Sequence, residues 1–367
     1  MNTQKDKNSI CFIGDLIFGD QPSTFGYGAC STWNPISYKD IFTHTKRELR
    51  NSGVVIGNFE CTVSEDIPDK NKNLNNYMMC CGSGVCRELY ENNIRIVSVA
   101  NNHTFDYGPE GYKRTTDALR SHNIRVIGDR KNPYVIINPD NPGRSVAVIA
   151  CSYIKIKHYE EAPYLLNPTS DEWKRILDEV RGKADHIIAY VHWGNEFVRY
   201  PTEMQRNIAS ELISMGVDDI IGCHPHILQS MQNINGHRIY YSIGNFVSDY
   251  WQRRLRYSVI LRLNNDTLDI KEIPCFIDGH SSPHLLKQTS DGLIKRSDRI
   301  SKNTDIFTNR NIVRVEYLTK MIVNFRKVRG KRALVKWIFE RAFYFIKNAK
   351  EEVRNPDVVY QKFEVKQ

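Results

Sequence analysis

The sequence contains no run of about 18 or more apolar residues, so we expect no membrane-spanning helix. The first nine residues are polar, and we expect no signal peptide there. No Cys-x-x-Cys pair occurs among the nine scattered cysteines, a usage typical of a reduced, cytoplasmic protein rather than a disulfide scaffold or a zinc finger. A glycine-rich loop of the P-loop type is also missing, which argues against an ATP-dependent ligase acting alone.

Basic charge is concentrated near the end of the chain. The net charge is +9, and residues 325–350 hold nine Lys or Arg and one acid, Glu340, so the remainder is close to neutral. Three interpretations of this segment stay open: a helix packed on the body with a solvated charged face, a helix on an anionic membrane surface, or a contact with a polyanion. The second would make the protein peripheral to the inner face of the membrane. We expect no specific nucleic-acid partner.

The order of apolar and amphipathic segments predicts an α/β fold. Several short apolar runs are continuous, as in strands buried on both faces, and they alternate with helical patterns. The predicted strands are 9–13, 54–57, 96–100, 126–127, 146–150, 187–191, 219–221 and 238–242. The predicted helices are 38–51, 85–92, 110–122, 170–181 and 202–215, and residues 257–276 have the period of an antiparallel hairpin. We therefore divide the chain into a catalytic body (9–277), a linker or surface excursion (278–309) and a basic helical extension (310–367).

Polar side chains follow five of the predicted strands at the point where each ends. In open α/β sheets, ligands gather outside the carboxyl ends of the strands. The segments are Gly14-Asp15, Asn58-Phe59-Glu60, Asn101-Asn102-His103, His192-Trp193-Gly194-Asn195-Glu196 and His224-Pro225-His226. Each has an ordinary alternative when taken singly, such as a turn or a core histidine, but packing does not explain all five together.

The histidine pair of the last segment gives the strongest single signal. Pro225 fixes its own φ and is expected to bias Cys223 and His224 towards extended geometry. Such a stiff loop would turn both imidazoles towards one small object, and neutral imidazole is the commonest metal ligand. The alternative is an exposed loop with two solvated histidines.

The mixture of ligand types indicates which chemistry to expect. Carboxylate, amide oxygen and imidazole together suit divalent zinc, manganese, iron or magnesium. Two such ions can hold a phosphoryl group and activate a water. His103 is then a candidate general acid, with Asp106 orienting it. A turn residue ahead of Tyr107-Gly108 is an equal alternative for Asp106.

With these residues identified, the chain resembles the CapA family of bacterial capsule or poly-γ-glutamate synthesis proteins, which is related to calcineurin-like metallophosphoesterases. The resemblance runs from about residue 9 to residue 248. It is carried by residues 101–108, 192–196, 224–226 and 241–246 (Asn-Asn-His-Thr-Phe-Asp-Tyr-Gly, His-Trp-Gly-Asn-Glu, His-Pro-His and Tyr-Ser-Ile-Gly-Asn-Phe).

The resemblance implies a four-layer αββα metallophosphoesterase-like sandwich with one or two divalent metal ions at the sheet ends. The implied metal ligands are Asp15, Glu60, Asn102, His192, His224 and His226, with Glu60 shared. His103 corresponds to the general acid. Asn58, Glu196 and Asn245 are candidate substrate-binding residues. The implied function is a metal-dependent phosphoesterase of capsule or surface-polysaccharide synthesis, acting on a phosphorylated or acidic polymer-related substrate; the alternative is a non-hydrolytic polymer-binding accessory protein of a synthase.

One position departs from the phosphoesterase pattern. Those enzymes carry a histidine two residues after the first aspartate, and this chain has Ile17 there. The first metal position would therefore lose a ligand, and His226 would be its main support. One ion or two ions remain alternatives on this basis.

Overall fold

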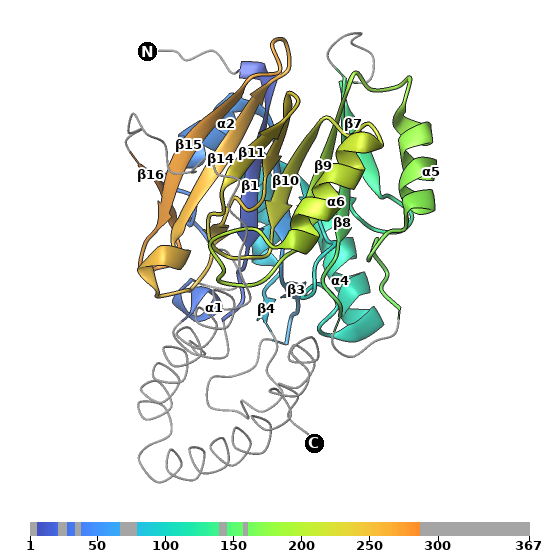
Figure 1. Cartoon of the computed structure of the whole chain (residues 1–367). Coiled ribbons are helices and arrows are strands. Elements are labelled where there is room, and N and C mark those ends of the chain that lie inside the picture. Colours follow the sequence, from blue (N-terminus) through green and yellow to red (C-terminus); the bar gives the residue numbers. More distant parts are fainter. Residues whose placement is uncertain are drawn as a thin grey trace, which may run out of the picture.

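The computed structural model describes residues 6–20, 28–33, 38–66, 79–138, 145–156 and 161–286. Within these ranges two large β-sheets lie face to face, with helices on their outer sides (Figure 1). The basic segment 325–350 and the expected helical extension 310–367 lie outside the described residues, so their roles stay predictions.

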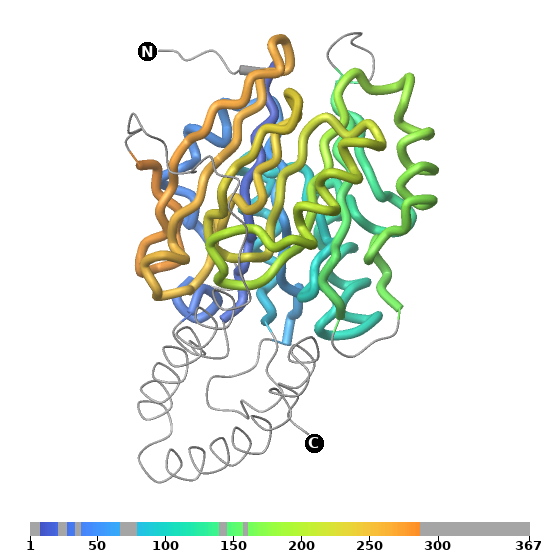
Figure 2. The backbone as a smooth tube through the Cα atoms, viewed as in Figure 1, coloured from blue at the N-terminus to red at the C-terminus, as the bar shows by residue number. Residues whose placement is uncertain are grey.

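The first sheet has a parallel centre and an antiparallel side. Its strand order is β16-β15-β14-β1-β2-β5-β6, and β13 also pairs with β1. The strands are β1 (Asp6–Leu16), β2 (Ser52–Phe59), β5 (Ile94–Ser98), β6 (Arg125–Ile127), β13 (Asn245–Val247), β14 (Tyr257–Asn264), β15 (Ile270–Ile277) and β16 (Pro283–Leu285). The predicted hairpin is β14–β15, and its first strand, β14, pairs with β1 from the start of the chain (Figure 2). The sheet continues with β16 past residue 277, inside the range expected to be a linker.

The second sheet has the order β11-β12-β10-β9-β8-β7, with parallel strands inside and antiparallel strands at both edges. Its strands are β7 (Tyr134–Ile137), β8 (Val146–Ser152), β9 (His186–His192), β10 (Asp219–Cys223), β11 (Met231–Ile234) and β12 (His237–Tyr240). A separate short ladder joins β3 (Thr62–Val63) to β4 (Cys80–Cys81).

Alternating side chains along the central strands form three apolar layers. In β1, Ile10 and Phe12 pack between the two sheets, whereas Cys11 and Ile13 pack towards the helices of the first sheet. Those helices are α1 (Ala29–Thr32), α2 (Lys46–Asn51), α3 (Gly84–Glu91) and α4 (Gly108–Ser121); α5 (Ser170–Val180) and α6 (Glu203–Ser214) cover the second sheet. The four-layer αββα sandwich that the resemblance implied is therefore the architecture of the described chain.

Helix ends follow local chemistry where the sequence supplies a cap. Thr169 and Thr202 begin α5 and α6 with reciprocal hydrogen bonds to Glu172 and Gln205. The predicted helix 38–51 is wrong in its first half, because only Lys46–Asn51 is helical. Tyr38 has a φ of 44° and Asp40 a φ of 71°, values that a right-handed helix does not allow.

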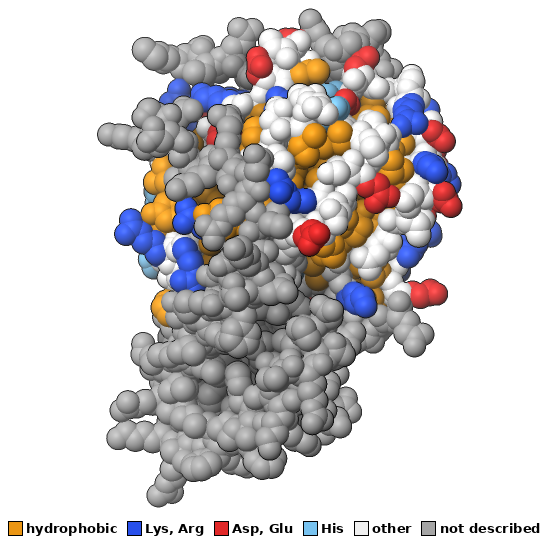
Figure 3. Space-filling model, viewed as in Figure 1, with side chains coloured by type: hydrophobic (Ala, Val, Ile, Leu, Met, Phe, Trp, Pro, Cys, Tyr) orange, Lys and Arg blue, Asp and Glu red, His pale blue; other side chains and the backbone are white. Residues whose placement is uncertain are grey.

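Among the described residues, no helix is long and apolar enough to cross a membrane. On the face shown in Figure 3, basic and acidic side chains are interspersed over α5 and α6, so charge of one sign does not accumulate there. All nine cysteines are buried and free, in agreement with the absence of a disulfide pattern in the sequence.

Candidate metal centre

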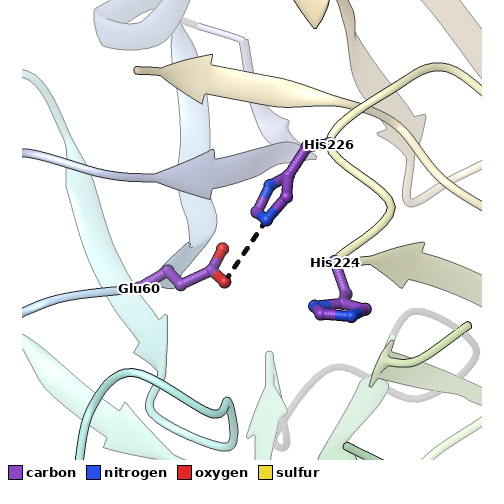
Figure 4. Close-up of side chains that lie close together, drawn as sticks. All are labelled: Glu60, His224 and His226. Atoms are coloured by element: carbon purple, nitrogen blue, oxygen red, sulfur yellow. Dashed lines mark ion pairs between the residues drawn. The ribbon is translucent and has the colours of Figure 1, made fainter. Parts of the chain in front are cut away.

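The five polar segments predicted from the sequence meet at one end of the two sheets. Asp15 and Glu60 come from the ends of β1 and β2, and Asn102 follows β5. His192 ends β9, while His224 and His226 follow β10. All six side chains are buried, and Figure 4 shows the Glu60 carboxylate directed towards His226 with the His224 ring beside it. The site therefore lies between the sheets, with ligands from both.

Asp15 is positioned by backbone geometry at the end of β1. It pairs with Asn245 of β13 and with Asn58 of β2 in the parallel ladders. A Cβ atom at Gly14 would overlap the carbonyl oxygen of Gly244, so only glycine allows β1 and β13 to approach this closely. The Asn58 side chain donates to Asp15 Oδ1 at 2.8 Å, which fixes the carboxylate.

Asn58 belongs to a chain of amides that the sequence only partly revealed. Asn101 Nδ2 donates to Asn58 Oδ1 at 3.1 Å and to the Phe59 carbonyl at 2.9 Å, while its Oδ1 accepts the backbone N–H groups of His103 and Thr104. Asn101 therefore shapes the turn that carries Asn102 and His103. We did not assign it a role from the sequence, although it is the first polar residue after an apolar strand.

Glu60 is the unusual group of the site. Its side chain is fully buried, and neither carboxylate oxygen has a hydrogen-bond partner among the described residues. Burial raises the pKa of Glu60 well above its ordinary value, and the negative charges of Asp15 and Glu196 raise it further. A buried carboxylate without a hydrogen-bond donor is costly unless a cation balances it.

His192 contacts Glu60 from the second sheet. Its Nε2 lies 2.8 Å from Asn102 Oδ1 and 3.5 Å from Glu60 Oε1. Burial lowers the pKa of His192 well below its ordinary value, and the neighbouring histidines 224, 226 and 103 add to this shift. The ring is therefore neutral at physiological pH, the form in which imidazole binds a metal.

The His224-Pro225-His226 loop has a backbone that differs from the expectation. His224 has a φ of 92° and His226 a φ of 56°, so the predicted extended geometry at His224 is wrong. The turn directs the backbone N–H of His224 to Asp15 Oδ2 at 3.2 Å. The expectation of extended geometry is based on Pro225 alone and does not include this contact with a distant residue. Positive φ at a residue other than glycine costs of order 1–3 kcal/mol, and such strain persists where surrounding contacts determine the conformation.

His226 contacts the acid at the end of β1. Its Nδ1 lies 3.3 Å from Asp15 Oδ2 and 2.9 Å from Asn245 Oδ1, and its Nε2 lies 3.8 Å from Glu60 Oε1. Burial lowers the pKa of His226, but Asp15 outweighs this, with help from Glu196 and Asn245, and the net shift is upward.

The ligand atoms form two overlapping groups that share one residue. Glu60, His224 and His226 are one group, and Asp15, Glu60 and His192 are the other; in each, the ligand atoms lie within 4.8 Å of one another. The donors are carboxylate oxygens and imidazole nitrogens, a set suited to a divalent ion. The Glu60 oxygens accept no hydrogen bond from the described residues, so these ligands would fit one or two cations. Glu60 belongs to both groups and could therefore contribute to either cation site.

The side chains of His103 and Asp106 lie at the edge of this cluster. His103 Nδ1 is 2.8 Å from Asp106 Oδ2, and both side chains are slightly exposed, at 15% and 10%. A carboxylate on Nδ1 holds the ring in one orientation and leaves Nε2 available for proton transfer. The close contact favours the orienting role for Asp106 over a simple turn.

Ile17 occupies the place where the phosphoesterase pattern has a histidine. Its side chain is fully buried in an apolar cluster with Met79, Ile227, Tyr250 and Leu255. The Asp15–His226 side of the site is therefore bordered by hydrocarbon rather than by a further ligand. Glu196 is only partly buried, and it acts on Glu60 and His226 through its charge.

The sequence is similar to a family of bacterial capsule synthesis proteins and to two proteins of Bacillus species. The family described as bacterial capsule synthesis protein PGA_cap matches residues 9–250. The PGA biosynthesis protein CapA of Bacillus subtilis (strain 168) is 28% identical over 270 residues, which cover 70% of this chain and 67% of that protein. The capsule biosynthesis protein CapA of Bacillus anthracis is 27% identical over 329 residues, covering 81% and 78%.

Solved structures resemble the chain more distantly. The 5'-nucleotidase of Candida albicans SC5314 superposes with a TM-score of 0.45 at 11% sequence identity. The match covers 85% of this chain and 58% of that enzyme, so the chain spans less than two thirds of the nucleotidase.

Proposed function

Since the chain belongs to the PGA_cap family of bacterial capsule synthesis proteins, we propose that it is a metal-dependent phosphoesterase of capsule or surface-polymer synthesis. The observation that carries this proposal is the Glu60 carboxylate. It is fully buried, lacks hydrogen-bond donors among the described residues, and belongs to both candidate ligand groups. A shared acid of this kind would help to hold divalent cations, and their positive charge would offset the negative charge of a phosphoryl group.

Several of the remaining ligands contact one another. Asp15 contacts His226, and Asn102 contacts His192, with the His224 ring centred 4.7 Å from that of His192. A divalent ion bound there supplies Lewis acidity and a nucleophilic water near neutral pH. The donor types allow Mn, Zn, Fe or Mg.

His103 would donate a proton to the leaving oxygen of the ester. Asp106, 2.8 Å from His103 Nδ1, orients the ring and stabilises its protonated form. Asn58 and Asn245 hold Asp15 and His226 through hydrogen bonds, which makes them positioning residues in addition to candidates for substrate contact. Glu196 stays a substrate-binding candidate.

The test uses the purified full chain with each of the four metals. Elemental analysis is expected to find a bound divalent metal, and a panel of phosphate mono- and diesters is expected to show metal-stimulated hydrolysis. His224→Ala and Asn102→Ala should abolish turnover, whereas His44→Ala, at an exposed histidine on a different surface, should not change it. Protein that binds no divalent metal and hydrolyses no ester with any of them would contradict the proposal.

A second function is favoured by Ile17. An apolar side chain beside Asp15 and His226 would suit a site that binds a metal weakly and does not turn over. The protein would then be a polymer-binding accessory component of a synthase. Binding of an acidic polymer that survives chelation, without hydrolysis of any ester, would support this alternative.

A further inference from the structure

Phe197, in the loop between β9 and α6, has a backbone conformation that is rare for a bulky residue. Its φ is 64°, in the left-handed region, where an aromatic side chain is a genuine outlier. Its backbone N–H donates to the Pro225 carbonyl at 2.8 Å, which ties this loop to the His224-Pro225-His226 loop. Strained residues of this kind persist where the surrounding structure determines them, and they concentrate at ligand sites.

Two buried glutamines hold the loop in this conformation. Gln229 Nε2 donates to the carbonyls of Val198 at 2.8 Å and Tyr200 at 3.2 Å. Gln205 Nε2 in turn donates to Gln229 Oε1 at 3.1 Å, and the same Gln205 caps the start of α6. The position of Phe197 is therefore fixed by a helix and a buried amide network, not by its own ring packing alone.

The ring of Phe197 lies beside the candidate metal centre. Its centroid is 5.9 Å from that of His226 and 5.6 Å from that of Tyr250, and Tyr250 is 5.3 Å from His226. Tyr250 is buried, whereas Phe197 is only partly buried. The rings of Phe197 and Tyr250 therefore form an apolar border beside His226.

Glu196 precedes Phe197 and is also partly exposed. Its charge contributes to the raised pKa of both Glu60 and His226, so the carboxylate is close enough to act on the centre. This loop therefore offers an aromatic face and an acceptor next to each other. A polyglutamate chain would bring further carboxylates to Glu196, which like-charge repulsion disfavours.

We propose that Phe197, Tyr250 and Glu196 form a subsite for a sugar ring attached to the phosphate. The inference rests on the proposed phosphoesterase function and names its substrate class as a sugar phosphate. The apolar C–H face of the sugar would pack on the ring of Phe197, backed by Tyr250, and a sugar hydroxyl would donate to Glu196. Binding sites commonly combine aromatic surface with a few placed polar groups in this way.

The test measures binding rather than turnover. Isothermal titration calorimetry on the metal-loaded full chain would compare methylphosphonate, a C-glucosyl methylenephosphonate (the glucosyl probe, with a CH₂ group in place of the bridging oxygen) and the 5'-phosphonate analogue of adenosine monophosphate. Their C–P bonds resist hydrolysis, so the result does not depend on whether the protein is active. We expect the glucosyl probe to bind about tenfold more tightly than methylphosphonate.

Three variants distinguish the contribution of the Phe197 ring to sugar binding from a general effect on the structure of the site. Phe197→Leu keeps apolar packing but removes the ring, and it should lose the tenfold preference while binding methylphosphonate and metal as before. Phe197→Tyr should keep the preference. Glu196→Gln removes a negative charge near all the anionic probes, so its expected effect is a smaller ratio of glucosyl-probe affinity to methylphosphonate affinity.

Several results would overturn the subsite. In the first, the unmodified chain binds the glucosyl probe no more tightly than methylphosphonate. In the second, Phe197→Leu loses affinity equally for all three probes. In the third, only the adenosine probe gains affinity from Phe197. If the chain prefers the glucosyl probe but hydrolyses no ester, the sugar subsite is supported and the proposed phosphoesterase activity is contradicted.

Discussion

Asp15 Oδ2 lies 3.3 Å from Nδ1 of His226, although Asp15 ends a strand of the first sheet and His226 follows a strand of the second. Asp15 also accepts the backbone N–H of His224 at 3.2 Å. One carboxylate thus connects the two sheets at the end where all the candidate ligands gather. The centre exists only when the sheets are packed together, so metal binding and folding are expected to be coupled.

Replacing Glu60 by glutamine should raise the stability of the metal-free chain while weakening metal binding. Folding raises the pKa of Glu60 above its ordinary value of 4.5 in the metal-free chain, so the unfolded chain loses this proton first as pH rises. Glu60 therefore destabilises the metal-free fold increasingly from about pH 4.5 upward. Glu60→Gln removes this penalty and should raise the free energy of unfolding of the metal-free chain by at least about 1 kcal/mol at pH 8 and by less at pH 5, with a higher melting temperature at both.

The same variant should lose the rise in melting temperature that divalent metal gives the unmodified chain. Differential scanning calorimetry with and without metal at both pH values measures both effects. Glu91→Gln, at an exposed position on α3, is the matched control and should change neither. Unaltered metal stabilisation in Glu60→Gln would contradict a shared ligand role.

His103→Ala should reduce hydrolysis in a way that depends on the leaving group. A general acid matters most when the departing oxygen is a poor leaving group, so an alkyl phosphate should lose about 10²–10⁴-fold in rate. An aryl phosphate with an acidic phenol should lose far less. Asp106→Asn, which weakens the 2.8 Å contact with His103, should show the same pattern with a smaller loss. Steady-state rates on the two esters test this, and equal losses on both would remove His103 from the acid role.

The sequence predicted the central strands and the convergence of the ligands because both depend on local patterns. Continuous apolar runs identify strands buried on both faces, such as β8 and β9. Parallel strands end at the same edge of a sheet, so the polar residues at the ends of β1, β2 and β5 gather at one edge of the first sheet, and those at the ends of β9 and β10 gather at one edge of the second. Side chains that alternate along each strand give both sheets an apolar inner face, and the two sheets pack together through these faces.

Other features depend on contacts between distant residues, which a single sequence does not show. The positive φ of His224 arises with its hydrogen bond to Asp15, more than 200 residues earlier. Phe197 is fixed by Gln229 and Pro225, and the short β13 forms only because it pairs with β1. The region 38–45 has helical periodicity but turns instead, since Tyr38 and Asp40 adopt left-handed conformations.

Ile17→His should alter the number of metal ions that the chain retains. Ile17 lies in an apolar cluster with Ile227, the residue after His226, and it stands where the resemblance implies a further ligand for the metal position of Asp15 and His226. We expect the unmodified chain to keep one tightly bound ion after dialysis and a second only in excess metal. An added imidazole should raise the retained ratio towards two.

The substitution should also lower the stability of the metal-free chain by about 1–3 kcal/mol, because a polar ring enters an apolar cluster without a partner. Metal should restore part of this loss. Elemental analysis after dialysis and manganese electron paramagnetic resonance give the stoichiometry, and Ile17→Val controls for the loss of apolar volume. An unchanged ratio of metal to protein in Ile17→His would show that Ile17 does not limit this position.

Asp219→Asn should affect acid stability and leave the metal centre intact. Asp219 begins β10, at the opposite end of the sheet from the ligands, and lies 2.8 Å from His186 Nε2 and 2.9 Å from Arg238 Nε. Burial alone would raise the pKa of Asp219, but hydrogen bonds and charge from His186 and Arg238 lower it from 3.8 to about 2. The ion pair therefore stabilises the fold above pH 3.8 by about 2 kcal/mol, and this contribution is lost as pH falls to about 2.

At pH 7, Asp219→Asn should cost about 3 kcal/mol, because it leaves the buried His186 and the largely buried Arg238 without their acid. Urea denaturation at pH 7 and pH 2.5 measures the difference, which should shrink at the lower pH. Asp117→Asn, in an exposed pair with Lys113, is the control and should not change stability measurably. Metal content should stay the same in both variants, since neither residue contacts the ligands. A loss of stability in Asp219→Asn that is equal at both pH values would show that the charge of Asp219 does not contribute to the acid sensitivity of the fold.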